Sequence, residues 1–340
     1  MTTNHKQRTA LALFSGGLDS TLACRVVAAQ GIKIVAVKFV TPFFGYELLQ
    51  KKQEYIRWIK EISDIDLKLK DVTIPYLELL KNPAHGYGKN FNPCIDCKIF
   101  LLSEARKIMP EIGASFLITG EVVGQRPMSQ RRDTLRIIER ESGCDDILVR
   151  PLCAKNLAPT KAENEGLIDR QKLLDFSGRN RKPQMQLAQK FGIKDYPSPA
   201  GGCILTDPIL SLRIQEYYET HEQIIPEDIL LMMVGRQLKL PSRAWLVVGR
   251  NQTENIKIEK LRLPDDWLLQ PKDIPGPSAI LRYSSKPEDL ETAASIVVRY
   301  SKKSARELGN AVIIADQNDT RQLINSRPLD DTVFQPWLRK

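Results

Sequence analysis

Apolar positions in the first part of the chain follow two alternating periods. Short apolar runs that fit buried strands are separated by longer segments in which apolar positions recur with helical spacing. We expect strands at 11–14, 32–40, 66–74, 115–118 and 146–152, and helices at 21–30, 48–62 and 98–109. Strands that alternate with helices predict an α/β fold with a Rossmann-like, doubly wound parallel sheet.

The pattern changes near residue 232, where short strands around Trp245 and Val248 begin. Residues 208–221 fit a helix before that change, and Pro226 suits the first position of another helix. We therefore expect three segments: a doubly wound domain at 1–155, a helical extension at 156–231 that carries Cys203, and a smaller C-terminal α/β domain at 232–340.

A small polar loop, Ser15-Gly16-Gly17-Leu18-Asp19-Ser20, joins the first strand to the first helix. Glycine accepts positive φ, so the chain can turn sharply there and leave N–H groups at the helix start facing outward. This arrangement suits a phosphate group. A Walker A loop has a different spacing and a lysine that this segment lacks. The alternative is a glycine turn with a Ser or Asp cap before an ordinary helix.

Other candidates stand at the carboxyl ends of predicted strands. Phe39 lies at the end of the second strand, and Thr119 and Gly120 follow the strand at 115–118. Ligands of doubly wound sheets bind at this edge, so we expect these residues near the nucleotide.

Cys94 and Cys97 form a C-x-x-C pair before a predicted helix, whose N-terminus is expected to lower a thiol pKa. The pair alone fits a redox couple, half of a zinc site or part of an iron–sulfur site. Cys203, in a Pro/Gly-rich loop, adds a third thiol, and three thiolates leave one iron of a [4Fe-4S] cluster open to sulfide. The metal-free alternative is a persulfide on one cysteine that another cysteine releases through a disulfide.

The composition limits the expected partners and the expected cellular location. A net charge of +9 and a pI of about 9.2 suit a polyanionic partner. Residues 1–8 are polar, and no stretch approaches 18 consecutive apolar residues, so we expect a cytoplasmic protein without membrane contact. Six cysteines do not make a disulfide scaffold in a chain of this length, and Cys24, Cys144 and Cys153 are expected to be structural.

Two segments are rich in basic residues. Five arginines at 122–140 face only two acidic residues, and the segment is either a solvated face or an RNA track that includes Arg131 and Arg132. A second cluster contains Arg181 and Lys182.

The loop at 15–20 resembles the PP-loop of the ATP pyrophosphatases, a HUP-type fold whose members split ATP between the α and β phosphates. With Asn92-Pro-Cys94-Ile-Asp-Cys97 and Cys203, the chain resembles the tRNA 2-thiouridylases. Thr119-Gly120-Glu121, with Gln125 and Gln130, is similar to the PP-loop domain of the tRNA 4-thiouridine synthetases. The resemblance implies ATP at Ser15, Gly16, Gly17, Asp19, Ser20, Phe39, Thr119, Gly120, Gln125 and Gln130. It implies that Asp19 either holds Mg²⁺ or orders the loop. It also implies a [4Fe-4S] cluster at Cys94, Cys97 and Cys203, and catalytic roles for Asp19, Cys97 and Cys203.

The C-terminal segment resembles the NFACT-R RNA-binding domain, on Gly235-Arg236-Gln-Leu-Lys-Leu-Pro241, Pro275-Gly-Pro277 and residues 293–301. That resemblance implies phosphate contacts by Arg236, Arg250, Arg299, Lys302 and Lys303.

Together these resemblances predict ATP-dependent tRNA thiolation, in which a uridine carbonyl is adenylated and its oxygen is replaced by sulfur to give 4-thiouridine or 2-thiouridine. The expected partners are tRNA and a sulfur donor, either sulfide or a cysteine desulfurase, and a homodimer is left open. The alternatives are another PP-loop sulfur- or nitrogen-transferase and a non-enzymatic RNA-binding factor.

Overall fold

The computed structural model describes residues 8–196, 202–301 and 309–339. The chain divides into two compact units, Met1–Asp207 and Pro208–Lys340. Helices α8 (Pro208–Thr220) and α9 (Pro226–Met232) fall in the second unit, whereas the three-segment division expected from the sequence stays a prediction. Among the described residues, no helix is long and apolar enough to cross a membrane.

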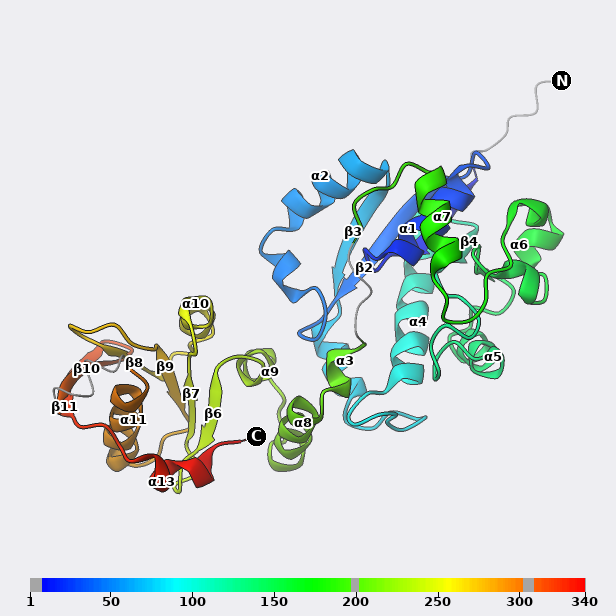
Figure 1. The fold of residues 1–340 in the computed structure, drawn as a ribbon. Coiled ribbons are helices and arrows are strands. Elements are labelled where there is room, and N and C mark those ends of the chain that lie inside the picture. The colour runs from blue at the N-terminus through cyan, green and yellow to red at the C-terminus, as the bar shows by residue number, and fades with distance from the viewer. Residues whose placement is uncertain (1–7, 197–201, 302–308, 340) are drawn as a thin grey trace. The chain divides into compact units, whose positions relative to one another are not determined.

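The first unit is built on a five-stranded parallel sheet with the order β3-β2-β1-β4-β5 (Figure 1). Its strands are β1 (Thr9–Leu13), β2 (Lys33–Val40), β3 (Asp66–Asp71), β4 (Phe116–Ile118) and β5 (Leu148–Val149). The expectation of a doubly wound α/β domain is thus confirmed. The strand expected at 66–74 ends earlier because the Asp71 carboxylate accepts the Thr73 N–H at 2.8 Å and starts α3 (Thr73–Leu79).

Helices cover both faces of this sheet. They are α1 (Leu18–Ala28), α2 (Lys52–Ser63), α4 (Cys94–Ile112), α5 (Arg132–Glu141), α6 (Lys161–Asn164) and α7 (Lys182–Lys190), in addition to α3. Side chains of β1 alternate between the two cores: Ala10 and Ala12 pack on the side of α1, and Leu11 packs on the side of α4. Burial on both faces explains why the central strand is apolar throughout.

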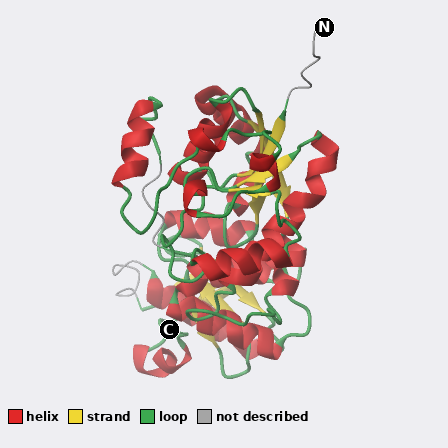
Figure 2. Ribbon diagram, turned by 90° about the vertical axis from the view of Figure 1, so that its right-hand side faces the viewer, coloured by secondary structure: helices red, strands yellow, loops and turns green. Residues whose placement is uncertain are grey.

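The second unit contains a six-stranded antiparallel sheet with the order β11-β10-β8-β9-β7-β6 (Figure 2 shows the strands in yellow). The strands are β6 (Arg236–Lys239), β7 (Trp245–Val248), β8 (Trp267–Pro271), β9 (Ala279–Arg282), β10 (Ala311–Gln317) and β11 (Thr320–Ser326). Its further helices are α10 (Gln252–Lys260), α11 (Pro287–Tyr300) and α13 (Asp331–Phe334). Ala293, Ala294 and Val297 of α11 are fully buried in the core of this sheet, so small residues let helix and sheet approach closely.

Candidate active site

The loop after β1 presents backbone donors at the start of α1. Its entry is anchored by the Phe14 N–H, which donates to the Val37 carbonyl at 2.8 Å. Gly16 takes a φ of +85°, and Gly17 is the N-cap residue with no side-chain cap on the described helix start. The Ser20 hydroxyl donates to the Gly17 carbonyl at 2.8 Å and lies 3.1 Å from the Ser15 hydroxyl. The first N–H groups of α1 are therefore open to an anion, as the sequence predicts.

Asp19, in this loop, has one carboxylate oxygen that accepts no hydrogen bond from a described residue. Its Oδ2 accepts from Gln125 Nε2 at 2.8 Å, and Gln125 Oε1 in turn lies 3.4 Å from Gln184 Nε2. Asp19 Oδ1 is buried, lies 3.7 Å from Arg181 Nη2 and makes no hydrogen bond within the described ranges. A buried carboxylate oxygen of this kind fits Mg²⁺, a hard cation that prefers oxygen ligands. The sequence-predicted residues Asp19 and Gln125 thus meet, and Arg181 joins them.

Gly120, which follows β4, packs directly against the loop. A Cβ at this position would lie 2.4 Å from the Asp19 carbonyl carbon and 2.5 Å from the Ser20 nitrogen. Thr119 is buried beside it, and its hydroxyl donates to Glu121 Oε2 at 3.2 Å. Only a glycine permits this close backbone approach, so the Thr119-Gly120 segment packs against the backbone of Asp19 and Ser20 and supports the loop.

Lys38 is a loop contact that the sequence reasoning missed. Its ammonium group donates to the Ser15 carbonyl and lies 6.0 Å from the centre of the Tyr55 ring. Burial lowers the pKa of Lys38, and the nearby Glu47 charge opposes that shift. The signal was present in the sequence, because a lysine near the carboxyl end of a buried strand points to the ligand edge.

Phe39 and Gln130 are buried without a described contact to the loop. Phe39 is 6% exposed and packs in the core on the α4 side of the sheet. The Gln130 carbonyl accepts the Gly124 N–H at 2.7 Å, and its side-chain Oε1 has no hydrogen-bond partner among the described residues. Their assignment to the nucleotide stays a prediction.

Three thiols lie within electrostatic range of the Tyr76 hydroxyl. Cys94 is the first residue of α4, Cys97 lies in the first turn, and Cys203 precedes a short turn at 204–206. Burial, followed by the effects of Cys97, Cys203 and Cys94, raises the pKa of Tyr76, which also hydrogen-bonds to Cys97. Asn90 Nδ2 donates to the Thr206 carbonyl at 2.7 Å and joins the two segments that carry the cysteines.

The expectation of a lowered thiol pKa at the start of α4 is wrong for Cys97. Burial raises the pKa of Cys97 to about 11, and the Tyr76 hydrogen bond and the Lys98 charge only partly offset this. Burial also raises the pKa of Cys203. Desolvation of a thiolate therefore outweighs the helix N-terminus here.

Within 8–196, 202–301 and 309–339, no three Cys, His, Asp or Glu side chains are placed to hold one metal ion together. In a [4Fe-4S] cluster each thiolate binds a different iron, so the thiols need not converge on a single point. The assignment of a cluster to these three cysteines stays a prediction. The other cysteines, Cys24, Cys144 and Cys153, are buried as expected for structural residues.

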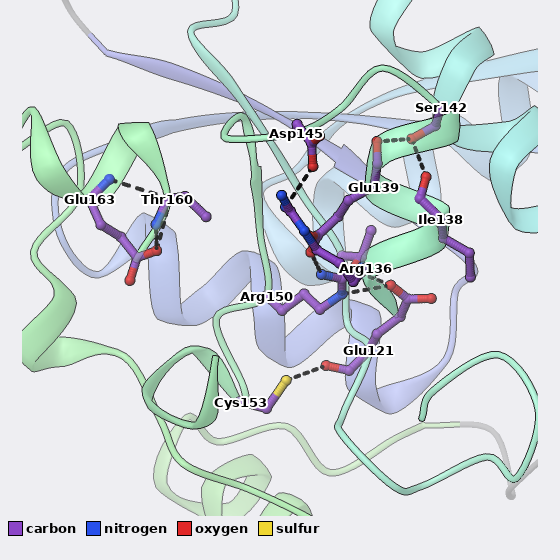
Figure 3. A network of polar contacts seen from close by, with 11 residues as sticks. Glu121, Arg136, Ile138, Glu139, Ser142, Asp145, Arg150, Cys153, Thr160 and Glu163 are labelled. Atoms are coloured by element: carbon purple, nitrogen blue, oxygen red, sulfur yellow. Dashed lines mark hydrogen bonds and ion pairs between the residues drawn. The ribbon is translucent and has the colours of Figure 1, made fainter. Parts of the chain in front are cut away.

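A buried ionic network connects α4, which carries Cys94 and Cys97, to the segment that follows β4 (Figure 3 shows the core of this network). Glu121 Oε2 lies 3.0 Å from Arg150 Nε, and Glu121 Oε1 lies 3.4 Å from Lys98 Nζ in α4. Arg150 also pairs with Glu139 of α5. Burial opposes ionisation of Glu121, but Lys98 and Arg150 outweigh it and lower its pKa to about 2. This network fixes α4 relative to the end of β4.

The arginines predicted to bind RNA mostly have internal partners. Arg131 lies 3.1 Å from Asp133, and Arg181 faces Asp19. Arg132 is exposed at the start of α5, and Lys182 begins α7. In the second unit, the Arg236 guanidinium lies 4.4 Å from the Tyr300 ring centre, Arg250 pairs with Glu254, and Arg299 pairs with Asp331. Lys302 and Lys303 lie outside the described residues.

The fold and the loop define a PP-loop α/β domain, followed by an antiparallel domain. Residues 5–158 match the family model "Thiamine biosynthesis protein (ThiI)", and residues 235–338 match "NFACT protein RNA binding domain". The chain therefore combines a ThiI-like PP-loop domain of the tRNA sulfurtransferase kind with a C-terminal NFACT RNA-binding domain. The resemblances to the PP-loop domain of the 4-thiouridine synthetases and to the NFACT-R domain are confirmed, and the resemblance to the 2-thiouridylases stays a prediction.

Curated relatives share the first domain. The probable tRNA sulfurtransferase of Thermococcus kodakarensis is 28% identical over 144 residues, 42% of this chain and 36% of that protein. The probable tRNA sulfurtransferase of Thermotoga maritima is 32% identical over 120 residues, 34% of this chain and 30% of that protein. The chain thus spans about a third of the length of these relatives. A solved 4-thiouridine synthetase–RNA complex with bound ATP is 24% identical, with a TM-score of 0.34, and the match covers 55% of this chain and 52% of that one.

Proposed function

We propose that this protein is an ATP-dependent tRNA sulfurtransferase that adenylates a uridine carbonyl and replaces its oxygen with sulfur. The observation that carries the proposal is the loop of residues 15–20. It combines backbone N–H groups at the start of α1 that no side chain caps with Asp19 Oδ1, which accepts no hydrogen bond from a described residue. Three thiols in the same unit supply the second feature that the reaction needs, which is a group that can carry sulfur. An amidotransferase or a simple RNA-binding factor needs no such thiol group.

The first step takes place at the loop of residues 15–20. The uridine oxygen attacks the α phosphorus of ATP, and the bond from that phosphorus to the β-phosphate bridge breaks to release pyrophosphate. The N–H groups at the start of α1 and the Lys38 ammonium favour negative charge on the phosphates. Mg²⁺ held by Asp19 Oδ1 supplies further charge neutralisation when it is bound.

The second step uses the thiols, with Cys203 as the persulfide carrier and Cys97 as the resolving residue. The terminal persulfide sulfur, supplied by a sulfur donor, attacks the activated carbon, and AMP leaves with the former carbonyl oxygen. Cys97 then attacks the Cys203 sulfur, which releases the thiolated base and leaves a Cys97–Cys203 disulfide. A dithiol reductant restores the two thiols. Free sulfide as the donor replaces oxygen in one displacement and makes no disulfide.

Mass spectrometry of nucleosides tests the proposal. Unmodified tRNA is incubated anaerobically with the protein, ATP, Mg²⁺ and either sulfide or a persulfide donor. We expect 4-thiouridine or 2-thiouridine from the wild type and from Cys24→Ala, whose thiol is buried in the apolar core. Cys203→Ser should still form AMP but lose persulfide-dependent thiolation.

Three results separate the alternatives. AMP formation without a thiolated base, with either donor, would favour another PP-loop transferase. Neither AMP nor a thiolated base would favour the non-enzymatic RNA-binding factor. Normal thiolation by Cys203→Ser with the persulfide donor would remove Cys203 from the mechanism.

A further inference from the structure

The second unit contains a cavity of about 320 Å³ that no step of the proposed chemistry uses. Its lining comes from α8 and the residue after it, from the end of α9, from strands β6 and β7 with the turn between them, from the turn that follows β9, and from Arg339. Ligand pockets begin at roughly 300 Å³, so the cavity has room for one nucleoside-sized group. Because α8 precedes the segment that matches the RNA-binding family, residues inside and outside that segment form the cavity together.

Aromatic rings form one wall of the cavity. Trp245 and Tyr283 are nearly parallel, with 17° between their planes and 6.5 Å between their centres. Tyr217 stacks on His221 at 4.3 Å, and the His221 ring centre lies 5.5 Å from that of Tyr283. Tyr283 is 49% exposed, which leaves much of its ring available to a planar ligand.

A buried ionic cluster holds these rings in place. The Tyr217 hydroxyl donates to Asp228 Oδ2 at 2.5 Å, and the Tyr283 hydroxyl donates to the same oxygen. The other oxygen of Asp228 pairs with Arg282, whose guanidinium also lies 2.6 Å from Asp266. Tyr283 has a φ of +58°, which is unfavourable for a bulky side chain. Such backbone strain is retained when surrounding contacts impose it, and it concentrates at binding sites.

The rim of the cavity is positively charged. Four basic side chains and one carboxylate line it, which gives a formal charge of +3 with His221 neutral. The carboxylate, Glu216, lies 2.9 Å from Lys239 and 2.7 Å from Arg339. Arg243 makes no side-chain hydrogen bond or ion pair to another described residue. It is therefore the cation most available to an anionic ligand.

We propose that this cavity binds one unpaired nucleotide of an RNA strand, with the base stacked on Tyr283 and a phosphate at Arg243. Aromatic faces next to cationic side chains are the chemistry by which proteins hold single-stranded nucleic acid. A base in a duplex is already stacked on its neighbours and does not enter. The inference takes from the proposed function only that the partner is RNA, and it does not depend on thiolation.

Fluorescence anisotropy with the full chain tests this inference. The probes are a labelled single-stranded RNA, the duplex of the same sequence, and unlabelled AMP and CMP as competitors. Tyr283→Asn removes the ring, and asparagine tolerates the positive φ. We expect single-strand affinity to fall about 5- to 100-fold, with little change for the duplex. Tyr283→Phe, which keeps the ring, should retain most of the affinity.

Matched controls come from the same unit. Leu323→Ala removes a side chain that is 59% exposed on β11, outside the cavity, and should bind as the wild type does. Arg243→Asn should reduce affinity for the single strand and lower its salt dependence. Arg321→Asn, at a residue paired with Asp316 outside the cavity, should have the smaller effect.

Two results would overturn the inference. One is equal single-strand affinity in the wild type and Tyr283→Asn. The other is Tyr283-dependent binding of AMP or CMP as tight as that of the RNA, which would assign the cavity to a free nucleotide. A protein that forms no AMP and no thiouridine but passes the RNA test would lose the proposed function and keep this inference.

Discussion

The two units use buried carboxylates in opposite ways. In the first unit, Asp19 Oδ1 accepts no hydrogen bond in the described ranges and has the Arg181 guanidinium 3.7 Å away, and the nearby Gln184 Oε1 also lacks a hydrogen bond. In the second unit, Asp228 uses one oxygen for Arg282 and the other for two tyrosine hydroxyls. Buried polar groups are costly when they are unpaired, so the open oxygen of Asp19 indicates a place for a ligand. The satisfied Asp228 indicates a scaffold.

The largest expected effect is a loss of stability when Asp228, the paired carboxylate of the second unit, is replaced. Asp228→Ala leaves the Arg282 guanidinium short of a buried partner and should destabilise the second unit by about 3–5 kcal/mol. Chemical denaturation followed by tryptophan fluorescence measures this, because three of the four tryptophans, at 245, 267 and 337, lie in that unit. Asp319→Ala, at an exposed turn, is the control and should change little. A loss of less than about 1 kcal/mol in Asp228→Ala would show that this cluster is not a scaffold.

Asp19→Asn, in the first unit, should instead affect activity and not stability. We expect it to reduce AMP formation about 100- to 1,000-fold, because the amide cannot supply the anionic ligand, and to leave stability nearly unchanged. Rates of AMP release and a denaturation curve give the two readouts. Asp133→Asn, whose partner is the exposed Arg131, should retain activity. Comparable AMP formation in Asp19→Asn would contradict the assignment of the open oxygen to the reaction.

Gly120→Ala tests the packing behind the loop. The new Cβ meets backbone atoms of Asp19 and Ser20 at 2.4–2.5 Å, so the loop must move. We expect a loss of about 1–3 kcal/mol in stability and a matching rise in the ATP concentration needed for half-maximal AMP formation. Gly192→Ala, at a residue with a φ of +68° and open space around it, introduces backbone strain without a steric contact and should affect stability alone. Unchanged ATP dependence in Gly120→Ala would contradict the role of this contact.

The smallest effect concerns the thiols. Because burial raises the pKa of Cys97 to about 11, the residue is a neutral thiol at pH 7. Its alkylation rate should therefore rise about tenfold per pH unit and level off only near that value. Tyr76→Phe removes a hydrogen bond that stabilises the thiolate and should raise the pKa further, by an amount equivalent to about 1 kcal/mol. Peptide mass spectrometry of the alkylated protein measures both, and a rate independent of pH between 7 and 9 would contradict them.

The sequence predicted the doubly wound sheet because most of its strands are short apolar runs between helices, whereas in β3 Leu67 and Leu69 alternate with charged residues. It also predicted the loop at 15–20, since glycines, hydroxyls and Asp19 stand next to one another in the chain. The end of β3 was misplaced because a single side-chain contact from Asp71 to the Thr73 N–H starts the next helix. Such a local contact competes with a continuing apolar pattern and is not visible in that pattern.

Contacts between distant residues were harder to predict. Arg181 meets Asp19 across 162 positions of the chain, and its basic neighbours suggested an RNA surface instead. The thiol pKa was wrong in direction because a helix start is visible in the sequence, whereas the burial of Cys97 depends on the whole fold. The Asp228 cluster was missed for the same reason, since its members come from α9, β9 and the segment between α10 and β8.

Following the uridine oxygen tests the central claim most directly. A tRNA transcript whose uridine carbonyls carry a heavy oxygen isotope is thiolated in a single turnover, and the AMP is analysed by mass spectrometry. Adenylation at the PP-loop predicts that AMP acquires the heavy oxygen in the same amount as thiouridine forms, and that Asp19→Asn slows the formation of both products about 100- to 1,000-fold. Thiouridine accompanied by unlabelled AMP would mean that ATP does not activate the uridine oxygen, and it would contradict the account.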